Sequence, residues 1–135
     1  MKTLIVEDDF YIRKLLKTFL ADYGDCDTVI DGVEAVEAFK MAHEEGHPYE
    51  LICMDIMMPN MDGQDALKKI REIEQEKNIK SREEVKVIMI TALKDPKSVF
   101  KAYYKGGATS YLAKPVTLEN LVKELKNMEL IEAGS

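Results

Sequence analysis

The sequence predicts an α/β fold in which helices cover both faces of a parallel β-sheet. Two observations support this prediction. Short apolar runs rich in β-branched residues alternate along the chain with longer stretches whose apolar residues recur at the spacing of a helix, and this alternation is typical of proteins with parallel sheets. No internal repeat or low-complexity linker interrupts the pattern over the 135 residues, so one domain with one core is expected.

Five strands are expected where short apolar runs are bounded by polar or turn-forming residues. They cover residues 3–6, 27–30, 51–54, 85–90 and 110–113. Asp55 directly follows the third run and Thr91 directly follows the fourth. Both side chains should therefore lie where a strand ends.

Five helices are expected between and after these strands, and capping, proline and glycine signals set their limits. The first covers residues 10–22, and its apolar face is formed by Ile12, Leu15, Leu16 and Phe19. The others run from an N-cap at Asp31 to about residue 46, from about residue 64 onward, from 95 to 106, and from an N-cap at Thr117. The charged segment 72–84 is expected to form a longer third helix or loop with a solvated face.

Composition limits the partners and the compartment. A net charge of −6 without a basic patch gives little support for direct binding to nucleic acid or to an anionic membrane, so protein partners are expected. The apolar run 4–6 is too short for a signal peptide or a membrane span. Cys26 and Cys53 lack metal-ligand spacing and suit reduced thiols. We therefore expect a stand-alone cytoplasmic protein, with a single domain over 1–135, a core of about 2–130, a short C-terminal tail and no attached output domain.

Ligands of open parallel sheets bind at the carboxyl ends of the strands, and here the residues at these ends are polar. Glu7 and Asp8 follow the first strand, Asp55 the third, Thr91 the fourth and Lys114 the fifth. Clustered carboxylates repel one another without a cation, and Mg²⁺ prefers such hard oxygen ligands. A carboxylate beside a metal can attack a phosphoryl donor while a lysine neutralises the phosphoryl oxygens. These residues predict a magnesium-dependent phosphoryl-transfer site with Asp55 as the nucleophile.

The motifs LIVEDD, MDIMMPNMDG, MITA and SYLAKP occur in this order along the chain. With them the whole chain resembles the response-regulator receiver domains of two-component signalling, and in particular the chemotaxis-type receivers that consist of one domain. The resemblance implies a flavodoxin-like (βα)5 three-layer sandwich with a five-stranded parallel sheet of strand order 2-1-3-4-5. It also implies a bound Mg²⁺, with Mn²⁺ as an alternative ion, held by Glu7, Asp8, Asp55 and the backbone carbonyl of Met57.

The same resemblance implies a role for each remaining site residue. Asp55 would accept the phosphoryl group from a sensor histidine kinase or a phosphotransfer protein, and Thr91 and Lys114 would contact its oxygens. Thr91 and Tyr111 would act together as the switch that reports phosphorylation. A cis peptide would join Lys114 to Pro115, consistent with the low cost of cis geometry before proline.

The implied function is a switch and not a turnover enzyme. Met57 and Leu93, two residues after Asp55 and Thr91, would tune hydrolysis, and because both are apolar the phosphorylated form should be long-lived. Self-phosphorylation would depend on Mg²⁺ and autodephosphorylation would be slow. The protein would engage a downstream protein through the face of the fourth helix, fifth strand and fifth helix, as a monomer or a phosphorylation-dependent dimer.

Other functions share part of this pattern. A phosphohydrolase of the haloacid-dehalogenase type also uses Asp, Thr or Ser, Lys and magnesium, but its second aspartate is replaced here by Met57. A flavodoxin-like cofactor binder would need a Gly- or Ser-rich phosphate loop after the first strand, where this chain has acids. The segment 43–47 matches the HExxH pattern of zinc proteases, yet Gly46 and Pro48 break the helix that would hold both histidines. We interpret that match as accidental.

Overall fold

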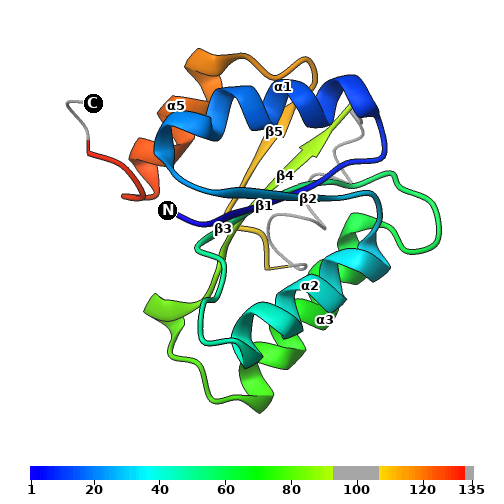
Figure 1. The fold of residues 1–135 in the computed structure, drawn as a ribbon, viewed down its shortest axis with the longest axis vertical. Coiled ribbons are helices and arrows are strands. Elements are labelled where there is room, and N and C mark those ends of the chain that lie inside the picture. Colours follow the sequence, from blue (N-terminus) through cyan, green and yellow to red (C-terminus); the bar gives the residue numbers. More distant parts are fainter. Residues whose placement is uncertain (93–106, 133–135) are drawn as a thin grey trace.

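The computed structural model describes residues 1–92 and 107–132. At its centre lies a sheet of five parallel strands in the order β2-β1-β3-β4-β5 (Figure 1). The α/β class and the strand order are therefore confirmed. The strands are β1 (Thr3–Val6), β2 (Cys26–Val29), β3 (Leu51–Asp55), β4 (Lys86–Thr91) and β5 (Ser110–Ala113). The described α-helices are α1 (Phe10–Leu20), α2 (Gly32–Glu44), α3 (Gly63–Glu76) and α5 (Leu118–Asn127).

The helices cover the two faces of the sheet in pairs. Helices α1 and α5 lie on one face, and α2 and α3 lie on the other (Figure 1). Because side chains alternate between the two faces of a strand, each central strand contributes to two cores. In β1, Leu4 and Val6 belong to the core beneath α2 and α3, whereas Ile5 belongs to the core beneath α1 and α5. The same alternation runs through β3 and β4, which explains why their sequences are continuous apolar runs.

The first helix is shorter than the sequence predicted. It ends at Leu20 and not at Asp22, because the chain tightens there into a 3₁₀ turn, Ala21–Tyr23. Gly24 follows with a φ of 139°, and a Cβ at this position would lie 1.9 Å from the carbonyl oxygen of Met1. Only glycine fits this turn, so the helix cannot continue through it.

The edge strand β2 begins one residue earlier than the predicted range 27–30. Its pairing with β1 places Cys26 opposite Thr3, and this register ends the strand at Val29. Ile30 lies beyond the strand and is half-exposed. The helix predicted over 95–106 lies outside the described residues.

One carboxylate in the charged segment 72–84 is buried, so the expectation of a solvated face is wrong at that position. Glu74 in α3 is only 1% exposed and accepts hydrogen bonds from Arg71 Nη1 and from the backbone N of Val85, both at 2.7 Å. Arg71 also donates to the carbonyl oxygens of Val85 and Gly107. Through these hydrogen bonds the Arg71–Glu74 ion pair links α3 to the residues just before β4 and just before β5.

Cys26 and Cys53 are free thiols on β2 and β3, with β1 between them. Burial raises the pKa of the Cys53 thiol to about 12, so this side chain behaves as a buried apolar group. Across residues 1–92 and 107–132, every helix is too short or too polar to cross a bilayer.

Candidate functional site

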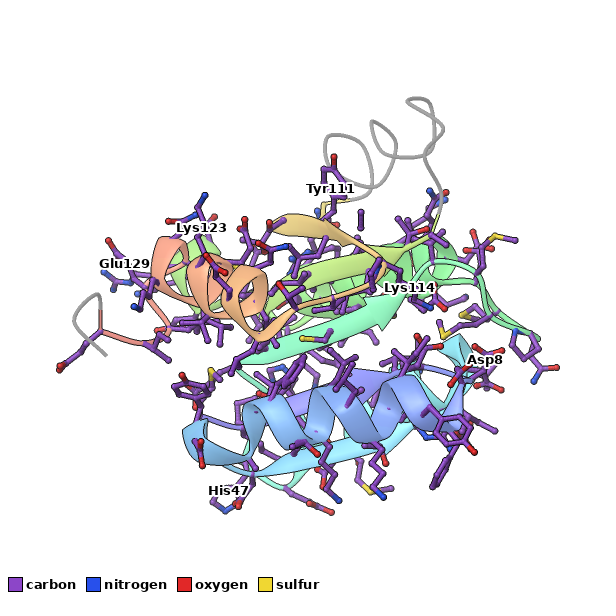
Figure 2. All side chains as sticks on the ribbon, turned by 90° about the horizontal axis from the view of Figure 1, so that it is seen from above. Asp8, His47, Tyr111, Lys114, Lys123 and Glu129 are labelled. Carbon is purple, nitrogen blue, oxygen red and sulfur yellow. The ribbon has the colours of Figure 1, made fainter. Side chains whose placement is uncertain are left out.

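The carboxyl ends of the strands meet at one edge of the sheet, where Asp8 and Lys114 both lie (Figure 2). Backbone hydrogen bonds continue the pairing beyond the strands. The backbone N of Ile56 donates to the carbonyl oxygen of Ile90 at 3.2 Å, and the backbone N of Lys114 donates to that of Thr91 at 2.8 Å. These bonds hold the loops after β3 and β5 against the end of β4, so side chains from distant parts of the sequence share one site.

Glu7 is buried at the end of β1, with 1% of its surface exposed. Its backbone N donates to the carbonyl oxygen of Val29, its Oε2 accepts from the backbone N of Asp9 at 3.2 Å, and its Oε1 lies 2.8 Å from Lys114 Nζ. Burial raises the pKa of Glu7 to about 7, because the contact with Lys114 offsets only part of the desolvation and the charge of Asp55 adds to the rise.

Asp55 is the last residue of β3 and is 6% exposed. Its Oδ2 accepts from Lys114 Nζ at 2.9 Å, and its Oδ1 accepts from the backbone N of Met57 at 3.1 Å. Gly63 lets α3 begin directly against this residue, since a Cβ at position 63 would lie 2.2 Å from the Asp55 carbonyl oxygen. The backbone around Asp55 is therefore closely packed, and its carboxylate is held by the Lys114 ammonium and the Met57 amide.

Lys114 serves two carboxylates with one ammonium group. Burial alone would lower the pKa of Lys114, but its contacts with Glu7 and Asp55 outweigh that effect and raise the pKa above its ordinary value. The ammonium group is therefore held in its charged form. The peptide bond between Lys114 and Pro115 is cis, as the resemblance implied.

Glu7, Asp8 and Asp55 form an acidic cluster in which one carboxylate oxygen of each lies within 4.8 Å of the others. Asp8 is exposed and the other two are buried, so the cluster is open to solvent on one side. Glu7 Oε1 is buried and lies 2.8 Å from the Lys114 ammonium. Three carboxylates that converge at a site open to solvent on one side fit the hard oxygen ligand set of a Mg²⁺ ion.

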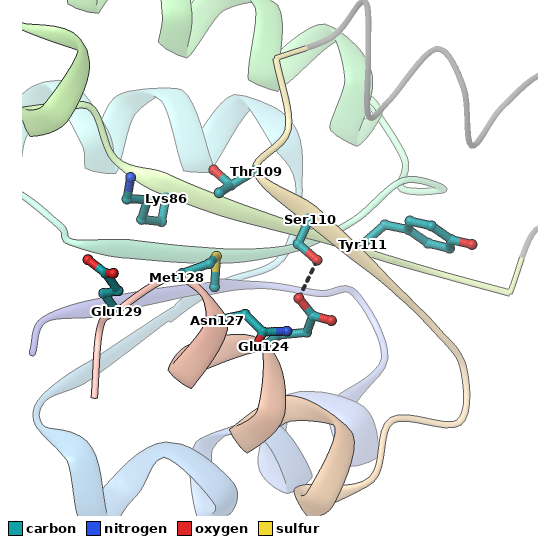
Figure 3. A pocket seen from close by; sticks show the side chains of 8 residues that line it. All are labelled: Lys86, Thr109, Ser110, Tyr111, Glu124, Asn127, Met128 and Glu129. Atoms are coloured by element: carbon teal, nitrogen blue, oxygen red, sulfur yellow. Dashed lines mark hydrogen bonds between the residues drawn. The ribbon is translucent and has the colours of Figure 1, made fainter. Parts of the chain in front are cut away.

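The other predicted site residues lie nearby or outside the described chain. Thr91 is buried at the end of β4, the strand next to Asp55. Tyr111 in β5 is 39% exposed, and Figure 3 shows its ring directed away from the pocket between β5 and α5. Met57 is 62% exposed in the loop after β3. Leu93 lies outside the described residues.

Two contacts that support the site were not predicted. Arg13 Nη1, from α1, donates to the carbonyl oxygens of Glu7 and Asp8 at 2.9 and 3.1 Å. Asp31 caps α2 as expected, but its second carboxylate oxygen also accepts from Asn60 Nδ2 at 2.7 Å, in the loop after β3. The sequence signals were a cation within the first turns after the acidic pair and an asparagine in the loop, and neither specifies its partner.

The HExxH segment does not form a metal site. Helix α2 ends at Glu44, before the second histidine, and Figure 2 shows His47 at the opposite end of the molecule from Asp8. Within the part of the chain that the structure describes, the acidic cluster around Glu7 is the one group of His, Cys, Asp and Glu side chains with metal-binding geometry. The interpretation of this match as accidental agrees with the structure.

Comparisons with curated proteins place the chain among response regulators. It is 35% identical over 129 residues to the chemotaxis protein CheY of Treponema pallidum, which covers 94% of this chain and 81% of that protein. It is 33% identical over 126 residues to the probable transcriptional regulator ycf29 of Porphyra purpurea, which covers 93% of this chain but 54% of that protein. The chain thus spans about half the length of several longer relatives.

Solved structures give the same result. The chemotaxis protein CheY4 of Vibrio cholerae has a TM-score of 0.77 at 30% identity and covers 94% of this chain and 97% of its own. The CheX–CheY complex of Borrelia burgdorferi with BeF3 and Mg has a TM-score of 0.80 at 27% identity, covering 98% and 90%. The Saccharomyces cerevisiae co-crystal of Ypd1 with the receiver domain of Ssk1 has a TM-score of 0.80 at 30% identity, covering 98% and 93%.

Receiver domains work in two-component signalling as switches that are phosphorylated on an aspartate, and their acidic pockets bind Mg²⁺. Residues 3–126 match the family described as the response regulator receiver domain. The sheet has the strand order 2-1-3-4-5, and an acidic cluster lies at the carboxyl ends of its strands. Because the family match also covers most of its length, the chain belongs to the response regulator receiver domain family.

Proposed function

We propose that Asp55 accepts a phosphoryl group from the phosphohistidine of a sensor histidine kinase or phosphotransfer protein. The observation that carries this proposal is one ammonium group between two carboxylates, with Lys114 Nζ 2.8 Å from Glu7 Oε1 and 2.9 Å from Asp55 Oδ2. An Asp55 oxygen would attack phosphorus, the P–N bond would break, and the leaving imidazole nitrogen would take up a proton. The solved complex of Ypd1 with a similar receiver supports this class of donor.

We assign Glu7, Asp8, Asp55 and the backbone carbonyl of Met57 as the protein ligands of Mg²⁺, for which Mn²⁺ could substitute. When bound, the ion would neutralise charge on the phosphoryl oxygens. The acidic cluster, in which the three carboxylates lie within 4.8 Å of one another, supports this assignment. So does the similar receiver from Borrelia burgdorferi, which was solved with BeF3 and Mg.

Lys114 and Thr91 would hold the phosphoryl oxygens once transfer is complete. The Lys114 ammonium already contacts Asp55, so it can pass from a carboxylate oxygen to a phosphoryl oxygen with little movement. Thr91 ends the neighbouring strand and brings a hydroxyl to the same edge. Tyr111 lies on β5 two residues before Ala113, the pairing partner of Thr91, and is exposed enough to turn inward when Thr91 moves. These two residues would form the switch.

Exposed apolar side chains that follow the site residues in the sequence favour a protein as the phosphoryl donor. Tyr11, Met57 and Leu118 are 81%, 62% and 47% exposed. Each lies within four residues of a site residue in the sequence. Phosphorylation would alter the face formed by β5, α5 and the segment between β4 and β5, and this face would then bind the downstream target.

We propose a switch with slow loss of the phosphoryl group, and not a turnover enzyme. Position 57, two residues after Asp55, is where a phosphohydrolase would place a second carboxylate as general acid. Met57 offers an apolar thioether instead, which can neither protonate a leaving group nor orient an attacking water.

The proposal is tested by incubating the purified protein with acetyl phosphate and Mg²⁺ and measuring the intact mass. The wild type should gain the mass of one phosphoryl group, and Asp55→Asn should not, because the amide keeps the shape but is a poor nucleophile. Asp22→Asn is the matched control, since Asp22 is an exposed carboxylate in the turn after α1. Uptake by Asp55→Asn at the wild-type rate, or no uptake by the wild type, would refute the assignment.

A further inference from the structure

Arg13 is a cation that contacts the backbone of two residues in the acidic cluster. It lies in α1, and its Nη1 donates to the carbonyl oxygens of both Glu7 and Asp8, at 2.9 and 3.1 Å. These are the two residues whose carboxylates join Asp55 in the cluster. The guanidinium carbon also lies 5.8 Å from the ring centre of Phe10, which orients the side chain back toward the turn.

The turn that carries these acids is short, and its two ends are already fixed. At one end, the backbone N of Glu7 continues the sheet by donating to Val29. At the other end, the Asp9 carboxylate caps α1 by accepting from two backbone amides of its first turn. Between these ends, the carbonyl oxygens of Glu7 and Asp8 both accept hydrogen bonds from the Arg13 guanidinium. A charged donor to a carbonyl forms a stronger hydrogen bond than a neutral one.

We propose that Arg13 is a positioning residue that fixes the turn between β1 and α1, so that the carboxylates of Glu7 and Asp8 face Asp55 as one ligand set. This inference rests on the proposed function, because it concerns the same Mg²⁺ and phosphoryl site. Partners that orient metal ligands through hydrogen bonds control metal affinity nearly as strongly as the ligands themselves.

Removal of Arg13 should change the Mg²⁺ affinity in opposite directions according to whether the residue acts by positioning or only by its charge, so its role can be measured. A positive charge close to a cation site repels Mg²⁺, so removing Arg13 should tighten Mg²⁺ binding if its charge alone mattered. If Arg13 holds the ligands in place, its removal should weaken Mg²⁺ binding even though a repelling charge has gone. A side chain that only stabilises the fold would lower the melting temperature and leave the Mg²⁺ affinity of the folded protein unchanged.

The experiment compares the full chain with Arg13→Ala, Arg13→Lys and Lys14→Ala by calorimetric titration with Mg²⁺. Lys14 is the matched control, because it is the next residue on the same helix, is exposed and carries the same charge. We expect Arg13→Ala to bind Mg²⁺ about 10-fold more weakly, and Lys14→Ala to bind as the wild type does. Arg13→Lys should fall between them, since lysine keeps a charged donor but carries it on a shorter side chain.

Amide hydrogen exchange without metal provides a second measurement. The backbone N of Asp9 donates to Glu7 Oε2, so its exchange should become faster in both Arg13 variants and stay unchanged in Lys14→Ala. If Arg13→Ala fails to fold, Arg13→Lys decides the matter by the same two readings. Equal or tighter Mg²⁺ binding by the folded Arg13 variants, with wild-type exchange at Asp9, overturns the inference while leaving the proposed function intact. A wild type that binds no Mg²⁺ overturns both.

Discussion

The buried carboxylate of Glu7 should make the metal-free protein less stable as the pH rises. The pKa of Glu7 is raised from 4.5 in the unfolded chain to about 7 in the fold, chiefly by burial. Between these two values the folded state binds the proton more tightly than the unfolded state does. The contribution of Glu7 to stability is therefore fully present below pH 4.5 and is lost as the pH rises through about 7.

The size of the effect follows from the same pKa values. A pKa difference of one corresponds to about 1.4 kcal/mol, so the rise from 4.5 to about 7 should lower the free energy of unfolding by about 3 kcal/mol above pH 7. Glu7→Gln keeps the shape of the side chain and stays neutral at every pH. At pH 8 and without metal, this variant should be more stable than the wild type by about 3 kcal/mol, and near pH 4.5 the two should be equal.

Urea unfolding in the presence of EDTA, followed by far-UV circular dichroism from pH 4.5 to 8.5, measures this difference. Burial also lowers the pKa of His43, so this group adds its own pH dependence to the stability. Because that contribution is the same in both proteins, it cancels when the free energy of unfolding of the wild type is subtracted from that of the variant. Glu37→Gln, which removes the same charge from an exposed position on α2, should follow the wild-type profile. Added Mg²⁺ should raise the stability of the wild type at pH 8 and should not raise that of Glu7→Gln. A flat difference between Glu7→Gln and wild type, or a variant less stable at pH 8, would show the reasoning to be wrong.

Two further predictions concern α3 and the lifetime of the phosphorylated state. Glu74→Ala should lower the free energy of unfolding by about 3 kcal/mol, because it removes both the partner of Arg71 and the acceptor of the buried Val85 amide. Glu72→Ala, at an exposed position on the same helix, should change it little, and equal effects in urea unfolding would contradict this. Met57→Asn combined with Leu93→Glu should speed the decay of phosphorylated protein after the donor is removed, because polar side chains can hold the attacking water, and decay as slow as in the wild type would count against it.

The sequence predicts most of the fold because the relevant information is local. In a sheet buried on both faces, a strand such as β3 must be a continuous apolar run, and its end is marked by the first polar residue, Asp55. The edge strand β2 carries a weaker pattern, since it is only partly buried, and its limits are set by pairing with β1. Nothing within residues 26–30 encodes that register, so the prediction was displaced by one residue.

The candidate site was predictable to the extent that its groups follow strand ends. Glu7, Asp55 and Lys114 converge because the carboxyl ends of parallel strands share one edge. The contacts of Arg13 with two carbonyl groups and of Glu74 with a distant backbone amide could not be predicted. Both side chains are charged and would be expected to face solvent. Glu74 is buried because α3 packs against the segment just before β4.

On the proposed function, the response to phosphorylation should begin at the ends of β4 and β5. A phosphoryl group on Asp55 replaces the single negative charge of the carboxylate with nearly two on the phosphoryl oxygens beside Lys114. The backbone N of Lys114 donates to the Thr91 carbonyl oxygen at 2.8 Å. On the other side of Asp55, the backbone of Glu7 is bonded to Val29 and the backbone of Asp55 packs closely against Gly63, so these segments resist displacement. Any movement of β5 then reaches α5 through Ser110, whose hydroxyl donates to the Glu124 carboxylate at 2.7 Å (Figure 3). On the proposed function, we therefore expect the response to reach β5 and α5 before it reaches α2.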